Sequence, residues 1–262
     1  MKSVKLIIIG IFVLTCFGTS LAQVGYNPLS VRPVLEDDIM YRKRVERRIN
    51  LKEKQNLPFF AQDKWITQVI LDGVNSGELT PYNYQTPSVD SLVPKWVLTQ
   101  EMWQNKLADS STRLAIGGGE GKRISVLEIT EEYIFDKRRS RMYIDILSVK
   151  LLVLPQTPTE ELDILAIFKF KDLHDYFRKV YARTNQMQAY WFNPKNDRRK
   201  LCFSDALDLR LFSSRITKIS NPLDDAIGDE VTGEYSGKLK TLYRSQEIEY
   251  ELMEYEHNLW EF

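Results

Sequence analysis

The sequence predicts an α+β fold: a central antiparallel hairpin or small sheet with flanking helices, preceded by an extended N-terminal arm. Two β-rich runs, residues 124–135 and 142–154, lie on either side of the polar segment DKRRS, as expected of a strand pair. Helix-spaced apolar residues occur before this pair at 65–74 and after it at 173–181. An apolar content of 43% in 262 residues is enough for a sizeable core, which we expect in a single domain over 37–262.

The first 22 residues have the layout of a secretory signal peptide. Lys2 and Lys5 precede an apolar run at 6–14, and a small-x-small cleavage site ends at Ala22. The apolar run is too short to span a bilayer as a helix. A lipoprotein leader that uses Cys16 is the less favoured alternative, because the threonine before it fits such leaders poorly. We therefore expect residues 1–22 to be removed and the remaining chain to be exported.

Glycine and proline without periodicity at 23–36 predict the extended arm. A helix is expected to start near Glu36, because acidic residues in a first turn complement the helix dipole. Asn50 and Glu53 have the spacing of a capping box for a second short helix, which Pro58 should end. The apolar residues of the first helix would be Ile39, Val45 and Ile49.

The middle of the chain alternates helix signals with loops. The helix at 65–74 should end near Gly77, and a shorter helix is predicted at 98–107. The glycine-rich stretch 117–122 departs in two places from a phosphate-binding loop, because its glycines are too close and Arg123 replaces the magnesium-binding Ser or Thr. We interpret it as a turn.

A further strand is predicted at 164–170, and the stripe at 173–181 should be a helix packed on the core. Ser204 is the expected cap of a helix at 205–212. A polar loop at 221–237 precedes the last helix, which is rich in glutamate. One side of that helix should carry Ile248, Leu252, Tyr255 and Leu259.

Charge and cysteine content narrow the class of function. The chain has 36 basic and 36 acidic residues, and loss of Lys2 and Lys5 with the leader would leave 34 basic residues. Nucleic-acid-binding domains are usually strongly basic, so nucleic acid is not an expected partner. Cys202 would be the one remaining cysteine, which excludes an internal disulfide. We expect a small core residue there, with an intermolecular bridge as the minor alternative.

The sequence shows no catalytic constellation. His174 and His257 are the only histidines, and neither has Cys or His nearby at the spacing of a metal site. Pairs of carboxylates occur at 37–38, 131–132 and 224–225, which we assign to a helix start, the solvent face of a strand and a loop. No serine has nucleophile-elbow neighbours. We expect no catalytic residue, no cofactor and no metal.

The chain ends in LWEF, although terminal residues are usually poorly ordered unless something holds them. Docking on the core of the same chain is the favoured explanation, and contact with a neighbouring subunit is the alternative. Trp260 and Phe262 are therefore candidate partner contacts, since aromatic residues are enriched in protein interfaces.

Five segments of the sequence have a combination and order that carry information beyond their local structure. They are DDIMYRKRV at 37–45, INLKEKQNLP at 49–58, YIFDKRRS at 133–140, YWFNP at 190–194 and YEHNLWEF at 255–262. Taken in order, these segments resemble the GldN/PorN family of gliding-motility and type IX secretion proteins of Bacteroidetes. Residues 155–185 and 221–237 contain nothing that can be placed against that family.

The resemblance implies a non-enzymatic periplasmic scaffold at the inner face of the outer membrane. Members of the family assemble with the outer-membrane lipoprotein GldK/PorK into rings and contact the motor protein GldM/PorM. A subunit of such a ring needs two different surfaces for its neighbours. A periplasmic hydrolase and a stand-alone ligand-binding module remain the alternatives.

The stretch at 41–54 carries seven basic residues in fourteen. On the predicted helix, Glu46 would pair with Arg42, one turn before it. Two interpretations remain open: a solvated helix face, or a protein-contact helix whose arginines meet acidic groups of a neighbour, such as its last helix. Arg44 and Arg48 are the candidate contacts. Reversing their charge is predicted to weaken ring assembly without unfolding the monomer.

Overall fold

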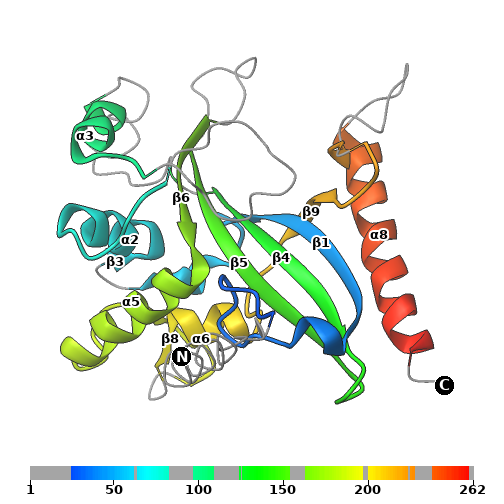
Figure 1. The fold of residues 1–262 in the computed structure, drawn as a ribbon. Helices are drawn as coiled ribbons and strands as arrows, with labels where there is room; N and C mark the ends of the chain where they lie inside the picture. Colours follow the sequence, from blue (N-terminus) through cyan, green and yellow to red (C-terminus); the bar gives the residue numbers. More distant parts are fainter. Residues whose placement is uncertain are drawn as a thin grey trace, which may run out of the picture.

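The computed structural model describes residues 25–61, 64–82, 97–108, 124, 126–153, 163–196, 200–223, 225–227 and 238–259. It confirms the α+β class. A five-stranded sheet of order β6-β5-β4-β1-β9 has antiparallel neighbours throughout, and helices pack around it (Figure 1). The predicted leader and the glycine-rich loop lie outside the described residues. Among the described helices, none is both long and apolar enough to cross a membrane.

The predicted hairpin forms the centre of the sheet. Strands β4 (Val126–Asp136) and β5 (Arg141–Val153) pair around the turn at 137–140. The predicted strand at 164–170 is confirmed as β6 (Asp163–Lys169), which pairs with the second half of β5. Every residue of β4 is buried, and a bulge between Thr130 and Glu131 shifts its register with β5. The predicted solvent face of this strand therefore does not exist.

The prediction of a helix that starts near Glu36 is wrong. Residues Glu36–Asp38 form a single 3-10 turn (η1), and Ile39–Asn50 form a twelve-residue strand, β1, between β4 and β9 (Arg215–Ile219). Burial of Val45, Arg47 and Ile49 in alternation is the period of a strand. The sequence concealed this period because one of the three inward-facing residues is an arginine.

The prediction of a second short helix after Asn50 is also wrong. Asn50 accepts a hydrogen bond from the backbone N–H of Lys52 (3.1 Å), in a turn rather than a helix cap. Only a 3-10 turn, η2 (Leu57–Phe59), follows, and Pro58 lies inside it. The fully buried Asn56 explains the conformation, because its amide donates to the carbonyls of Asn50 (2.8 Å) and Ser213 (2.9 Å). A contact with a residue that is distant in the sequence therefore fixes this turn.

Three other helices, two before the central hairpin and one after it in the chain, agree with the sequence predictions. Helix α2 (Ile66–Asn75) ends before Gly77, whose φ of +75° is a conformation that favours glycine. The short helix at 98–107 is confirmed as α3 (Gln100–Ala108). The stripe at 173–181 is confirmed as part of α5 (Phe170–Arg183).

Helix α6 (Phe203–Asp208) is shorter than predicted, and Ser204 does not cap it. The Ser204 hydroxyl is buried in the first turn and donates to Cys202 Sγ at 3.2 Å. The last helix is confirmed as α8 (Lys238–Asn258). Two short ribbons complete the secondary structure, which are β2 (Phe60–Ala61) with β3 (Lys64–Trp65) and β7 (Tyr190–Trp191) with β8 (Leu201–Cys202).

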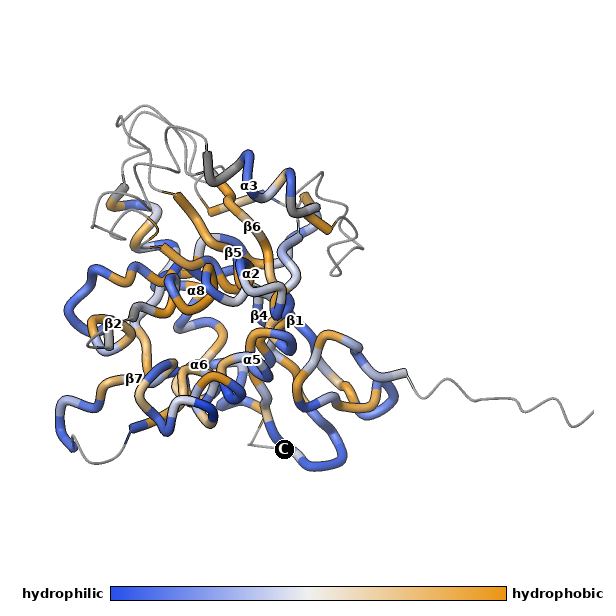
Figure 2. The backbone as a smooth tube through the Cα atoms, turned by 90° about the vertical axis from the view of Figure 1, so that its left-hand side faces the viewer, coloured by the Kyte–Doolittle hydropathy of each residue, from blue (hydrophilic) through white to orange (hydrophobic). Residues whose placement is uncertain are grey.

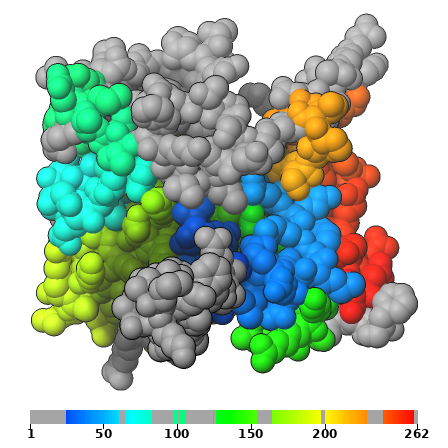
Figure 3. All heavy atoms as spheres, viewed as in Figure 1, coloured from blue at the N-terminus to red at the C-terminus, as the bar shows by residue number. Residues whose placement is uncertain are grey.

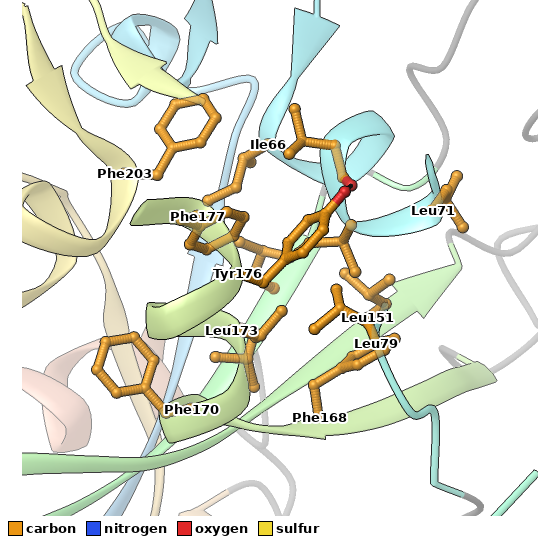
Figure 4. Packing of buried hydrophobic residues seen from close by; sticks show 14 of the residues in the cluster. Ile66, Leu71, Leu79, Leu151, Phe168, Phe170, Leu173, Tyr176, Phe177 and Phe203 are labelled. Carbon is orange, nitrogen blue, oxygen red and sulfur yellow. Dashed lines mark hydrogen bonds between the residues drawn. The ribbon is translucent and has the colours of Figure 1, made fainter. Parts of the chain in front are cut away.

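Two separate hydrophobic clusters hold these elements together. In the larger one, Leu173 of α5 points toward Leu151 and Phe168 of the sheet, and the ring of Tyr176 points toward α2, where its hydroxyl donates to the Val69 carbonyl at 3.2 Å (Figure 4). The tube coloured by hydropathy shows hydrophobic residues along the central strands and hydrophilic stretches in peripheral loops (Figure 2).

The smaller cluster lies between the sheet and α8. The ring of Tyr41 on β1 also stacks on Tyr255 of α8, with centroids 4.3 Å apart. The buried members of this cluster are Val45, Tyr133, Ile216, Ile219, Ile227, Ile248 and Leu252.

The described part of the predicted arm, 25–36, folds back on itself. Tyr26 and Leu35 form an antiparallel bridge, and the Glu36 N–H donates to the Gly25 carbonyl at 2.9 Å. Leu29 and Val34 are buried, and Val31 packs against the larger hydrophobic cluster, so the segment packs against the domain.

Candidate functional site: a charged sheet and two exposed surfaces

The arginines of β1 are paired with glutamates of the neighbouring strand. The register places Arg44 opposite Glu132 and Arg48 opposite Glu128, on the same face of the sheet. Arg44 Nη2 lies 3.2 Å from Glu132 Oε1, and Arg48 Nε lies 2.7 Å from Glu128 Oε2. Arg44 and Arg48 of the basic stretch are therefore paired with glutamates inside the domain.

Arg47 points to the other face and connects the sheet to the last helix. Its Nε lies 3.3 Å from Glu131 Oε2, its Nη1 donates to Glu249 of α8, and its Nη2 donates to the Tyr133 hydroxyl at 2.8 Å. Burial opposes the positive charge, but Tyr133, Glu131 and Glu249 together raise the pKa of Arg47 above its usual value. One of the two interpretations of this stretch places its arginines against acidic groups of a neighbouring subunit, such as its last helix. The structure shows one such contact within a single chain.

A lysine of β5 completes the charged face. Lys150 Nζ donates to Glu128 Oε1 at 2.9 Å and to Glu46 Oε2 at 3.3 Å. Burial alone would raise the pKa of Glu128, but Lys150 and Arg48 outweigh it and hold that pKa below its usual value. The predicted pairing of Glu46 with Arg42 is wrong, because both lie on a strand. Arg42 instead donates to Glu36 at 2.7 Å.

Glu131 and Glu132 were expected on a solvent-exposed face, and that expectation is wrong. Both are buried, with 0% and 1% of each residue exposed. Arg47 contacts Glu131 as an ion pair without a hydrogen bond, and Glu131 Oε1 accepts a hydrogen bond from Arg210, which follows α6, at 2.8 Å. The cations that make this burial possible lie about 80 residues away in the sequence, so no local pattern could reveal them.

Of the four candidate partner contacts, two lie in this network and two lie outside the described residues. The side chains of Arg44 and Arg48 are 31% and 44% exposed, so part of each faces solvent while the guanidinium contacts a buried glutamate. Trp260 and Phe262 belong to the undescribed end. The preceding residues of α8 do pack on the chain's own sheet.

The histidines and the cysteine show ordinary structural roles. His174 is buried, with Nδ1 3.4 Å from Asp175 and Nε2 3.7 Å from Asp208. His257 is exposed on α8. Cys202 is a buried free thiol, as predicted for a core residue, and burial raises its pKa. Over the described ranges, His, Cys, Asp and Glu side chains form no group of three or more that could hold a metal ion.

Two exposed surfaces of the structure are not among the contacts predicted from the sequence. The first, which we call the basic turn, is the exposed tip of the central hairpin. The buried Asp136 holds it by accepting hydrogen bonds from the backbone N–H groups of Arg138 (2.8 Å) and Arg139 (3.0 Å). Its exposed cationic residues are Lys137, Arg138, Arg139 and Arg141.

The second surface is the outer stripe of α8, defined by Leu239, Tyr243, Gln246, Tyr250 and Met253. These side chains are exposed, and α8 lies at the edge of the molecule in the space-filling view (Figure 3). The sequence does not indicate this stripe, because the apolar residues on the side of α8 that faces the sheet account for the helical pattern by themselves.

The chain matches the model of a known protein family. The family described as "Gliding motility associated protein GldN" matches residues 34–261, which include all strands and helices described above. No curated protein of similar sequence was found. The match covers most of the 262 residues, in agreement with the resemblance carried by the segments between 37 and 262. The chain therefore belongs to the GldN family of gliding-motility-associated proteins.

Proposed function

We propose that this chain is a non-enzymatic structural subunit of the type IX secretion and gliding machinery, located in the periplasm. In this proposal it assembles with the outer-membrane lipoprotein GldK/PorK and with copies of itself into a ring, and it contacts the motor protein GldM/PorM. The observation that carries the proposal is the GldN family match over residues 34–261. The secretory layout of residues 1–22 supports export.

Ion pairs connect β1 to the elements on both sides of it. Arg48 and Glu128 connect β1 to β4, and Arg47 and Glu249 connect β1 to α8. In each pair one side chain is buried and the other is 41–44% exposed. Separating these elements would therefore leave a buried charge with one partner fewer, which disfavours their separation.

The proposal is tested by purifying the affinity-tagged chain from membranes of its own organism. We expect GldK/PorK to copurify and the particles to appear as rings in electron micrographs. An isolated monomer in the presence of GldK/PorK, together with a pocket that binds a small molecule, would overturn the proposal. That result would favour the ligand-binding module, and turnover of a substrate would favour the hydrolase.

The partner role of Arg44 and Arg48 also remains a proposal, and the network changes how it should be tested. Charge reversal would place a new carboxylate at position 44 beside the buried Glu132 and another at position 48 beside the buried Glu128, so lost assembly could reflect unfolding. Neutralisation to glutamine is the better change. We expect Arg44→Gln with Arg48→Gln to reduce recovery of GldK/PorK while the far-ultraviolet circular dichroism spectrum is retained.

The matched control for this experiment is Arg178→Gln, which removes an arginine from an exposed ion pair with Asp205 far from β1. It should leave recovery of GldK/PorK unchanged. Equal recovery with the doubly neutralised chain and the control would assign Arg44 and Arg48 a structural role alone.

A further inference from the structure

Helix α8 has apolar residues on two opposite sides. Ser245, Ile248 and Leu252 are buried against the sheet. The outer stripe begins at Leu239, and its centre lies about 150° away around the helix, at 100° per residue. Four of its five members are large apolar residues with 59–67% of their surface exposed. Exposed apolar residues gathered on one helix face are typical of an interaction site.

The spacing of the outer stripe favours another helix as its partner. Its members are separated by four, three, four and three residues, from Leu239 through Gln246 to Met253. Alternation of four and three is the heptad pattern of a helix pair, in which side chains of one helix fit between those of the other.

The stripe is also complementary to itself when two copies run in opposite directions. Read from either end, it has an aliphatic residue, a tyrosine, Gln246, a tyrosine and an aliphatic residue. Antiparallel pairing about Gln246 brings Tyr243 against Tyr250 and Leu239 against Met253. The central glutamine would meet its own copy, and a single polar residue in such a seam fixes the register.

The charges of α8 favour the same direction. Residues 238–244 carry three basic and no acidic residues, whereas residues 247–256 carry five glutamates and no basic residue. Parallel pairing would place the five glutamates of one copy beside those of the other. Antiparallel pairing places the basic end of each helix beside the acidic end of its partner, which lowers the electrostatic energy.

We propose that the outer stripe of α8 binds the outer stripe of a second copy of this chain, antiparallel, about a twofold axis near Gln246. The contact is isologous, because each copy contributes the same surface. The stripe from 239 to 253 is about 21 Å long at 1.5 Å per residue, so the contact is small and the dimer dissociates readily on dilution. The proposal does not depend on ring formation. An isologous contact cannot close a ring, and it would add a link between two subunits.

Cysteine crosslinking tests the direction of pairing. In the antiparallel pair, position 246 meets itself, whereas position 253 meets position 239. Under mild oxidation, Gln246→Cys should therefore form a disulfide-linked dimer, and Met253→Cys should form one only when mixed with Leu239→Cys. The unmodified chain controls for the buried Cys202. Self-crosslinking of Met253→Cys as fast as of Gln246→Cys, or no crosslinking at any position, would overturn the proposal.

Sedimentation velocity of the purified chain over a wide concentration range tests the pairing itself. We expect a reversible dimer. Tyr250→Glu should raise its dissociation constant by roughly tenfold or more, because the substitution enters the contact twice and aromatic residues dominate such contacts. Leu209→Glu, at an exposed leucine off α8, should leave the dimer unchanged. A chain that stays monomeric at every concentration, or a dimer equally weakened by both variants, would refute the contact.

Discussion

Replacement of Arg47 by leucine should be the most destabilising single change in the charged sheet. Arg47 Nε lies 3.3 Å from Glu131, and its Nη groups donate to Glu249 on α8 and to Tyr133. Leucine fills much of the same volume and suits a strand, so the packing loss is small. The cost arises because Glu131, fully buried, loses its neighbouring cation.

The expected loss of stability in Arg47→Leu follows from how exposed each partner of Arg47 is. Glu249 has 41% of its side chain exposed, so loss of its ion pair with Arg47 lowers stability by at most about 1 kcal/mol. Removing one partner of a buried ion pair costs about 3–5 kcal/mol. Arg210 still donates to Glu131 at 2.8 Å, which places the expected loss near the lower end, about 3 kcal/mol. Because domains are stable by about 5–15 kcal/mol, the variant should still fold.

The measurement is urea unfolding of the purified chain, followed by circular dichroism and by tryptophan fluorescence. The doubly substituted chain, Arg47→Leu with Glu131→Leu, should be more stable than Arg47→Leu, because it no longer contains the buried carboxylate without its partner. Arg178→Leu serves as the control, since its pair with Asp205 is exposed on both sides and should change stability by less than about 1 kcal/mol.

Two results would refute this reasoning. If Arg47→Leu costs no more than Arg178→Leu, Glu131 does not depend on Arg47 in the folded protein. If the double variant is less stable than Arg47→Leu, the carboxylate contributes through contacts other than the arginine.

Three further predictions concern pH and packing. Glu128 has a lowered pKa, so it stabilises the fold above its usual pKa of 4.5, and the stability gap to Glu128→Gln in urea titrations should shrink as pH falls below that value. Burial, together with Glu132, raises the pKa of Asp145 from 3.8 to about 6; its ionisation therefore opposes folding increasingly between these two pH values and fully above about pH 6, and Asp145→Asn should raise stability by roughly 1–2 kcal/mol at pH 8 but not at pH 4. Gly73→Ala should lower stability by about 1–3 kcal/mol in thermal melts despite alanine's better helix propensity, because a Cβ there would lie 2.6 Å from Tyr176 Cζ. No loss in Gly73→Ala, or an Asp145→Asn effect that is the same at both pH values, would contradict these explanations.

The elements that the sequence predicted correctly have regular apolar patterns. Residues 124–135 and 142–154 carry runs of β-branched and aromatic residues around a polar turn, and they form β4 and β5. The stripe that includes Leu173 and Phe177 repeats with the helical period and forms α5. In these segments the residues that face the core are apolar, so hydrophobicity and burial coincide.

The prediction failed where a charged or polar residue is buried. Arg47 takes the inward position between Val45 and Ile49, so β1 lost its strand period and was assigned to a helix. Glu131 and Glu132 were placed in solvent for the same reason. Asn56 gives a third case, since its buried amide contacts the distant Ser213 backbone and fixes a turn that the sequence assigned to a helix.

The sequence by itself determined the fold class, the central hairpin, the helices α2, α3, α5 and α8, and the family. These follow from local periodicity and from short segments in a fixed order. Only the tertiary structure decided what the basic stretch at 41–54 does and which face of α8 remains open. The physical reason is that a charge can be buried only beside a compensating charge, and here that partner comes from a distant strand or helix.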